Sequence, residues 1–94
     1  MSQRNGNMLQ ELIRFVLSVD RRIYVIKEFQ YQPIVQASEA AKRSGRSLQN
    51  MSRALKELTK KGIVSCVNSE QRTWKRYILT ETGKEVLKTS RART

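Results

Sequence analysis

Residues 38 to 64 read SEAAKRSGRSLQNMSRALKELTKKGIV and contain two short helical patterns that meet at a tight turn. Gly45 falls where the chain must turn sharply, and glycine tolerates the backbone angles that such a turn requires. Ser47 can then cap a second helix that opens at Leu48, and Gly62 ends that helix. This spacing predicts a helix-turn-helix.

The second helix of this motif, residues 48 to 61, has two different faces. At about 100° per residue, one arc collects apolar side chains that are expected to face the core: Leu48, Met51, Ala54, Leu55 and Leu58. The opposite arc holds residue types that pair with bases and phosphates, namely Gln49, Arg53, Lys56 and Lys60, with Asn50 and Glu57 on its flank. Any solvated helix also shows basic residues opposite an apolar stripe, so this helix by itself favours neither reading.

The residues that follow predict a β-hairpin. Residues 63–67 and 74–80 are rich in β-branched and aromatic side chains, as strands are, and residues 68–73 form a polar connection. The segment 68–76 suits a basic wing that lies along a phosphate backbone, and its basic residues are Arg72, Lys75 and Arg76. The sequence therefore predicts a winged helix-turn-helix: a mainly α fold with a small β-hairpin (α+β), an extra N-terminal helix and a C-terminal helix.

Three motifs in the run from Leu12 to Leu87 resemble the archaeal and bacterial winged helix-turn-helix regulators of the MarR and ArsR type. They are the SEAAKRSG helix and turn, the segment S-x-x-x-x-S-R-A-L-K-E-L-x-K-K-G-I-V, and the closing K-R-Y-I-L-T-E-T-G-K-E-V-L. The resemblance implies a DNA-binding fold, usually a homodimer and usually a transcription factor. It names neither an operator nor a small-molecule effector.

Composition agrees with a nucleic-acid partner. The 94 residues make one domain, and a hydrophobic content of 38% allows a modest core. The net charge of +11 implies a polyanion, most often nucleic acid, with a membrane surface as the lesser alternative. No apolar run approaches the length of about 18 residues that spans a bilayer, and the start MSQRNGNM lacks a signal-peptide segment. We expect a cytoplasmic, nucleoid-associated protein.

Catalysis and metal binding find no support in the sequence. The chain has no histidine, so the usual general base and any Cys/His zinc constellation are missing, and no Gly-rich phosphate loop is present. We expect no enzyme activity, no metal and no cofactor. The single cysteine, Cys66, is expected to be a small core residue rather than a redox switch.

The only tryptophan, Trp74, has two readings. At the start of the second predicted strand it could brace the hairpin, or it could meet DNA sugar and base edges. Bracing is the favoured reading, because a tryptophan buries a large apolar area when it packs.

The N-terminal third carries an apolar stripe before a break at Asp20-Arg21-Arg22. The predicted division is a disordered segment 1–7, a winged helix-turn-helix domain 8–88 whose first helix is 8–18, and a frayed basic tail 89–94. The stripe could pack on its own domain against Val86 and Leu87, or pair with a second subunit. Pairing is favoured, because a three-helix winged core is complete without residues 8–18. The residues predicted for dimerisation are Leu9, Leu12, Ile13, Val16 and Leu17.

Two shorter features complete the pattern. Pro33 bars helix continuation, and Ile34 and Val35 are expected to add a short third strand to the hairpin. Ser38 is expected to cap the helix that follows.

These expectations assign roles in DNA binding. Gln49, Asn50 and Arg53 are predicted to read bases in the major groove. The residues predicted to contact the DNA backbone are Arg43, Arg46, Ser47, Ser52, Lys56, Lys60, Arg72, Lys75 and Arg76. The predicted function is a sequence-specific double-stranded DNA-binding transcriptional regulator. The alternatives are a non-specific chromatin or architectural protein, an RNA-binding factor, and a protein-interaction winged helix.

Overall fold

Seven elements follow one another along the chain in the computed structural model, which describes residues 2–93 and the side chains of residues 8–90. They are α1 (Ser2–Leu17), α2 (Asp20–Glu28), α3 (Ala37–Ser44), α4 (Leu48–Lys60), β1 (Val64–Cys66), β2 (Tyr77–Leu79) and α5 (Glu81–Arg93).

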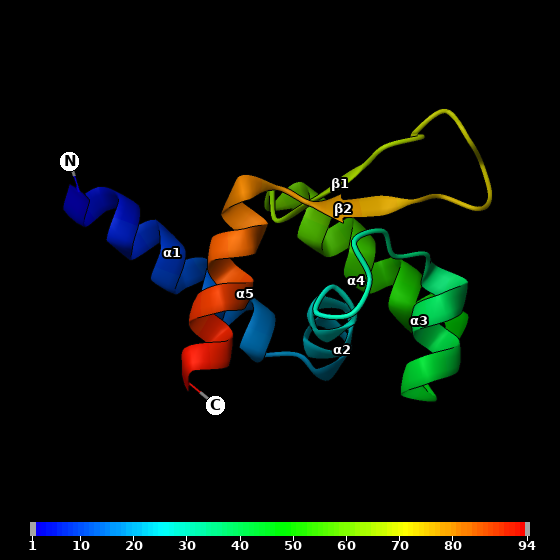
Figure 1. Cartoon of the computed structure of the whole chain (residues 1–94), viewed down its shortest axis with the longest axis horizontal. Coiled ribbons are helices and arrows are strands. Elements are labelled where there is room, and N and C mark those ends of the chain that lie inside the picture. Colours follow the sequence, from blue (N-terminus) through cyan, green and yellow to red (C-terminus); the bar gives the residue numbers. More distant parts are fainter. Residues whose placement is uncertain (1, 94) are drawn as a thin grey trace.

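The helices form two groups that meet along the hairpin. α4 packs against both α2 and α3, and α5 packs against α1. Figure 1 shows α1 and α5 towards one end of the molecule, while the loop between β1 and β2 projects from the other end, above α3 and α4. The helix-turn-helix formed by α3 and α4 therefore lies beside the hairpin loop and away from the two termini.

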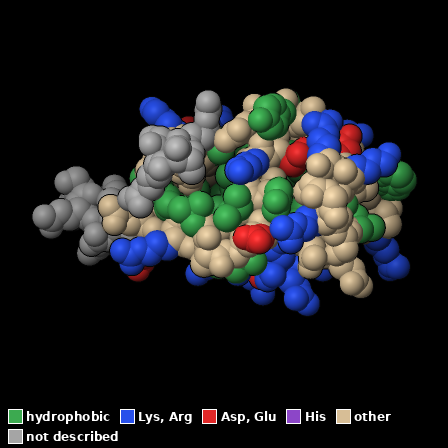
Figure 2. Space-filling model, turned by 90° about the horizontal axis from the view of Figure 1, so that it is seen from below, with side chains coloured by type: hydrophobic (Ala, Val, Ile, Leu, Met, Phe, Trp, Pro, Cys, Tyr) green, Lys and Arg blue, Asp and Glu red, His purple; other side chains and the backbone are tan. Residues whose placement is uncertain are grey.

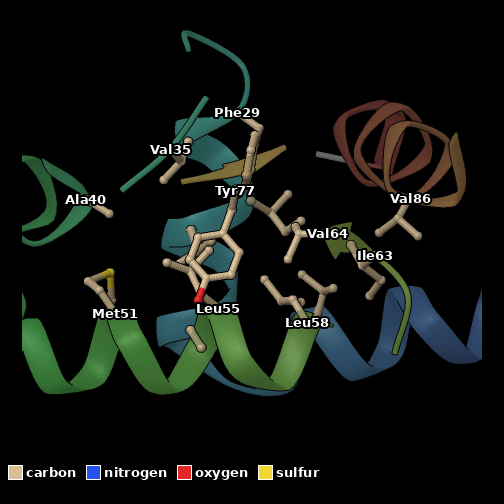
Figure 3. Packing of buried hydrophobic residues seen from close by; sticks show 14 of the residues in the cluster. Phe29, Val35, Ala40, Met51, Leu55, Leu58, Ile63, Val64, Tyr77 and Val86 are labelled. Carbon is tan, nitrogen blue, oxygen red and sulfur yellow. The ribbon is translucent and has the colours of Figure 1, made fainter. Parts of the chain in front are cut away.

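The core surrounds the inner face of α4 and receives side chains from the hairpin and from the other helices. Met51, Leu55 and Leu58 of α4 are fully buried; Leu55 and Leu58 point towards Tyr77 and Val64, and Met51 points towards Ala40 of α3 (Figure 3). The prediction of an apolar face on α4 is thus confirmed for Met51, Ala54, Leu55 and Leu58. It is wrong for Leu48, which is 56% exposed. Leu48 is the first residue of α4 and lies at the edge of the core, beside the hairpin loop.

The hairpin is antiparallel and shorter than the sequence predicts. Val64 pairs with Leu79 and Cys66 with Tyr77, so the strands cover only part of the predicted ranges 63–67 and 74–80. Beyond this register the side-chain oxygen of Asn68 accepts the backbone N–H of Arg76 at 2.8 Å, so a side chain takes the place of a cross-strand carbonyl. The regular ladder ends there.

The predicted third strand exists as a single bridge. The backbone N–H of Val35 donates to the carbonyl of Tyr77 at 2.9 Å, and the N–H of Tyr77 donates back at 3.0 Å. Val35 is buried, so this bridge ties the segment after Pro33 to the hairpin.

Three helix ends differ from the prediction. α1 begins at Ser2, so this helix extends into the range 1–7. α3 begins at Ala37 with Gln36 as its N-cap, and no side chain caps it, so the predicted cap at Ser38 is wrong. α5 continues to Arg93 through the range predicted to be a frayed tail, and Ser90 is buried in it.

The N-terminal stripe is divided between the core and the surface. Ile13 and Val16 are each 1% exposed and belong to the core of their own chain, so their predicted role in dimerisation is wrong. The prediction assumed that the core is complete without α1, whereas α1 contributes Ile13 and Val16 to it. Leu9 and Leu12 are half-buried, and Leu17 is exposed.

A close approach fixes the start of α5 beside β1. The Thr80 hydroxyl oxygen accepts the backbone N–H of Gly83 at 3.0 Å, and that hydroxyl lies 2.6 Å from the carbonyl oxygen of Gly62. A Cβ atom added to Gly83 would lie 2.0 Å from the carbonyl oxygen of Ile63. The position of a Cβ is fixed by its own backbone, and the atom that it would meet is also backbone, so neither can move aside by a side-chain rotation. Position 83 therefore requires glycine.

We predict that Gly83→Ala destabilises the fold by about 1 to 3 kcal/mol, because the backbone must move to admit the methyl group and this outweighs alanine's better helix propensity. Urea unfolding measures the free energy. Thr82→Ala, at the exposed neighbouring position, should change it by less than about 0.5 kcal/mol. If the two variants are equally stable, the approach of α5 to β1 does not limit the side chain at position 83.

Candidate nucleic-acid interface

The outer face of α4 is open to solvent along its length. The side chains on it that are exposed are Gln49, Asn50, Arg53, Lys56 and Lys60, as the sequence predicts. Ser52, on the flank of this face, is half-buried. Because the inner face of the same helix is fully buried, the rotation of α4 about its axis is fixed and the outer face has one orientation.

The turn before α4 is held by two serines. Gly45 adopts a left-handed conformation with φ of 74°, and the Ser44 hydroxyl oxygen accepts the backbone N–H of Arg46 at 3.1 Å. The Ser47 oxygen accepts the backbone N–H of Asn50 at 3.0 Å, which confirms Ser47 as the N-cap. The first turn of α4, which carries two of the predicted base-reading residues, is therefore anchored at its backbone.

Glu57 attaches α4 to α2 instead of lying on the outer flank as the sequence suggests. Arg21 donates to its two carboxylate oxygens at 2.7 and 3.1 Å, and Arg22 donates to one of them at 3.1 Å. The Arg22 guanidinium also stacks 3.7 Å from the ring centre of Phe15 on α1. The sole acid of α4 is thus neutralised on the inner side, which leaves the outer face cationic.

These hydrogen bonds shift the titration of the carboxylate. The hydrogen bond from Arg21, followed by that from Arg22, lowers the pKa of Glu57 from its ordinary 4.5 to about 2. The cluster of Glu57, Arg21 and Arg22 was not found from the sequence, which showed only a break at residues 20–22. The available signal was the pair of arginines in a chain with few acids.

The loop between the strands, residues 67–76, forms the wing. Asn68 holds its two sides together, because its amide nitrogen donates to the carbonyl of Trp74 at 3.1 Å while its oxygen accepts from Arg76. Arg72 and Arg76 are exposed and Lys75 is half-buried. The three predicted basic residues of the wing therefore lie on a loop whose two ends are joined by the Asn68 side chain.

A groove separates the wing from α4. Its volume is about 460 Å³, and it is lined by Gln36, Ala37, Ser38, Leu48, Ser52, Leu55, Lys56, Arg72, Thr73, Trp74, Lys75 and Tyr77. The structure thus brings together residues that the sequence assigned to backbone contact from two different elements: Ser52 and Lys56 from α4, and Arg72 and Lys75 from the wing.

Two other predicted contact residues are engaged elsewhere. A terminal nitrogen of Arg43 lies 3.7 Å from the Glu28 carboxylate, and one of Arg46 lies 3.6 Å from that of Asp20. The Arg46 guanidinium also stacks over the ring of Tyr24 at 4.6 Å. Both arginines connect the α3 turn with α2, and neither lines the groove.

The described residues hold no group of three or more acidic, cysteine or histidine side chains placed to bind a metal ion. Within the same residues, no helix has the length and apolar character needed to cross a membrane. The thiol of Cys66 is half-buried and donates to the side-chain oxygen of Asn68 at 3.6 Å.

The Glu57 cluster predicts a specific pH dependence. A carboxyl whose folded pKa lies below its unfolded value stabilises the fold above about pH 4.5, and this stabilisation is lost as the pH falls towards 2. We expect Glu57→Gln to be less stable than the unmodified protein by about 1 to 2 kcal/mol at pH 7, after allowance for solvent screening. The difference should shrink towards zero as the pH falls to about 2.

Urea unfolding at several pH values measures this difference. Glu11→Gln removes the same charge from an exposed position on α1 and should change stability by less than about 0.5 kcal/mol. A gap between Glu57→Gln and the unmodified protein that does not vary with pH would mean that the ion pairs contribute nothing to stability.

Comparison with known proteins supports the fold. No protein-family model and no curated protein matches the chain. Among solved structures, the crystal structure of a MarR family transcription regulator superposes with a TM-score of 0.69 over 99% of this chain, at 22% sequence identity. The chain spans 64% of the length of that protein. The winged helix-turn-helix predicted from the sequence is confirmed, and the fold is that of a MarR family regulator.

Proposed function

We propose that this protein is a sequence-specific double-stranded DNA-binding transcriptional regulator. The observation that carries the proposal is the exposed outer face of α4, because its residue types match the donors and acceptors of a major groove. The burial of the opposite face fixes the rotation of the helix, so these side chains point outward. Within the described part of the chain, Arg53, Lys56 and Lys60 make no salt bridge, so their charges are available to a polyanion.

Charge placement favours DNA over a merely solvated helix. The only acid of α4, Glu57, is paired with two arginines of α2, so the outer face carries no negative charge. The wing adds exposed basic residues on the far side of the groove. A cationic helix and a cationic loop on one side of the molecule match the phosphate backbones that border a major groove.

The roles follow from position along α4. Gln49, Asn50 and Arg53 lie in its N-terminal half, which enters a major groove first in helix-turn-helix proteins, and they would read base edges. Ser47, Ser52, Lys56 and Lys60 would contact phosphates, together with Arg72, Lys75 and Arg76 from the wing. Arg43 and Arg46 would contribute less, because each already faces a carboxylate.

A symmetric pair of chains would complete the DNA-binding unit. α1 leaves apolar surface accessible to solvent, because Met8 and Leu17 are exposed and Leu9 and Leu12 are only half-buried. Figure 2 shows hydrophobic side chains along the middle of the face that lies away from the wing, with charged side chains among and around them. A homodimer through this face would set two recognition helices about 34 Å apart, one turn of DNA.

Selection of bound sites from a random duplex pool at about 0.15 M salt tests the function, since affinity without salt control is uninterpretable. We expect an enriched inverted repeat with half-sites about ten base pairs apart. The mass in solution, measured on the same sample, should be twice the 10.9 kDa of one chain.

A second function would be indicated by the opposite result. Tight binding without any enriched sequence would fit a non-specific chromatin protein, which the net charge of +11 also suits. A single-chain mass would remove the symmetric arrangement but leave the fold and its outer face as they are.

Two substitutions separate base reading from backbone contact. We predict that Arg53→Ala costs about 1 to 3 kcal/mol on the selected site and relaxes the sequence preference, whereas Lys75→Ala weakens all sequences alike and reduces the salt slope by about one. Fluorescence anisotropy on selected and random duplexes at several salt concentrations measures both effects.

Arg14→Ala is the matched control, because Arg14 is exposed on α1 and lies neither on the outer face of α4 nor in the groove beside the wing. It should leave the ratio of specific to random affinity unchanged. Equal losses on selected and random DNA for Arg53→Ala would remove Arg53 from the base-reading role.

A further inference from the structure

Trp74 occupies an unusual position for a large aromatic residue. Its side chain is 74% exposed, and its backbone has φ of +61°, a left-handed conformation that residues with bulky side chains rarely adopt. This exposure disagrees with the favoured sequence reading, in which Trp74 braces the hairpin. Strained, exposed residues of this kind are concentrated at binding sites, because the surrounding structure must hold them there.

The wing supplies that support through the backbone. The amide of Asn68 donates to the carbonyl of Trp74 at 3.1 Å, and the oxygen of the same amide accepts from the N–H of Arg76. Both hydrogen bonds fix the backbone at Trp74 and just after it, and the indole takes part in neither.

The indole forms one wall of the groove between the wing and α4. The second wall includes Leu48, the other large hydrophobic side chain on the groove that is more than half exposed. Three cations line the same groove, Lys56, Arg72 and Lys75, and the described residues that line it include no acid. The groove therefore combines two apolar surfaces with a rim of positive charge.

We infer that this groove seats one sugar–phosphate strand of duplex DNA, with the Trp74 indole and Leu48 against deoxyribose rings and the three cations on the flanking phosphates. The inference rests on the proposed function. If α4 lies in the major groove and the wing lies across the adjacent backbone, the strand between them must pass through the space that separates these two elements. Apolar walls suit the hydrocarbon part of the sugar, and the cationic rim suits its phosphates.

The inference assigns a DNA contact to two residues that are neither basic nor able to pair with bases. It also predicts that this contact is independent of sequence, since every nucleotide presents the same sugar. Affinity for random and for selected duplexes should therefore depend on Trp74 alike.

The sole tryptophan makes the test direct. Acrylamide quenching of Trp74 fluorescence is measured on the full chain, alone and saturated with a short duplex of mixed sequence, while anisotropy of labelled duplex reports binding independently. We expect bound DNA to shield Trp74 from acrylamide and Trp74→Asn to weaken binding at least about fivefold. Asparagine tolerates the left-handed conformation, so the urea midpoint of the free protein should not fall.

Tyr31→Asn is the matched control, because Tyr31 is also 74% exposed and lies outside the groove. It should leave duplex affinity unchanged. A drop in the urea midpoint of Trp74→Asn would show that the indole braces the wing and would overturn the inference.

The proposed function and this inference fail in different ways. If the unmodified protein gives no anisotropy change with any duplex, the proposed function fails and the inference with it. If the protein binds duplex while Trp74 stays as accessible to acrylamide as in the free chain, only the inference fails.

Discussion

Burial of one side of α4 is the constraint on which the rest of the structure depends. Four side chains on this side have no exposed surface: Met51, Ala54, Leu55 and Leu58. Through this side, α4 packs against α2, α3 and the hairpin. Full burial of a large apolar side chain contributes about 1.5 to 3 kcal/mol, so this stripe is a main source of stability in a chain of 94 residues. The outer face of α4 is positioned as a consequence of this packing.

Polar contacts add to this packing. Glu57 links α4 to Arg21 and Arg22 of α2, and Arg22 continues the link to Phe15 of α1. The buried stripe fixes the rotation of α4, and the hydrogen bonds between this carboxylate and two guanidinium groups add a contact of defined geometry. The same cluster removes the negative charge of α4 from the surface that faces DNA in our proposal. Glu57 thus contributes both to the packing of α4 on α2 and to the positive charge of the outer face of α4.

The hairpin has a regular base and an irregular outer part. Its base is short and regular, with Val64 and Tyr77 buried and Tyr77 paired to both Cys66 and Val35. Its outer part is irregular, held by Asn68, and carries a strained aromatic residue and three basic ones. The close approach of Gly83 to Ile63 holds α5 against the residue that precedes β1. The base of the hairpin is therefore packed against α5, whereas the wing projects beyond this packing.

The sequence by itself determined the architecture of the motif. Local patterns carry this information: the left-handed turn at Gly45, the cap at Ser47 and the stripe from Met51 to Leu58 each depend on residues a few positions apart. The exposed residues of the outer face followed from the same periodicity, because the residues opposite a buried stripe are exposed.

Only the tertiary structure decided which surfaces remain free. The sequence places Ile13 and Val16 on one apolar face of a helix, and the same pattern results whether that face packs in its own chain or against a second chain. Periodicity therefore cannot tell burial within the chain from dimerisation, and only the structure shows that both residues are buried in their own chain. Glu57 is paired across 36 residues with Arg21, and Trp74 faces a groove whose other wall is 26 positions earlier in the chain at Leu48. Such contacts join segments that are distant in sequence, so they are set by how the elements pack and have no local signature.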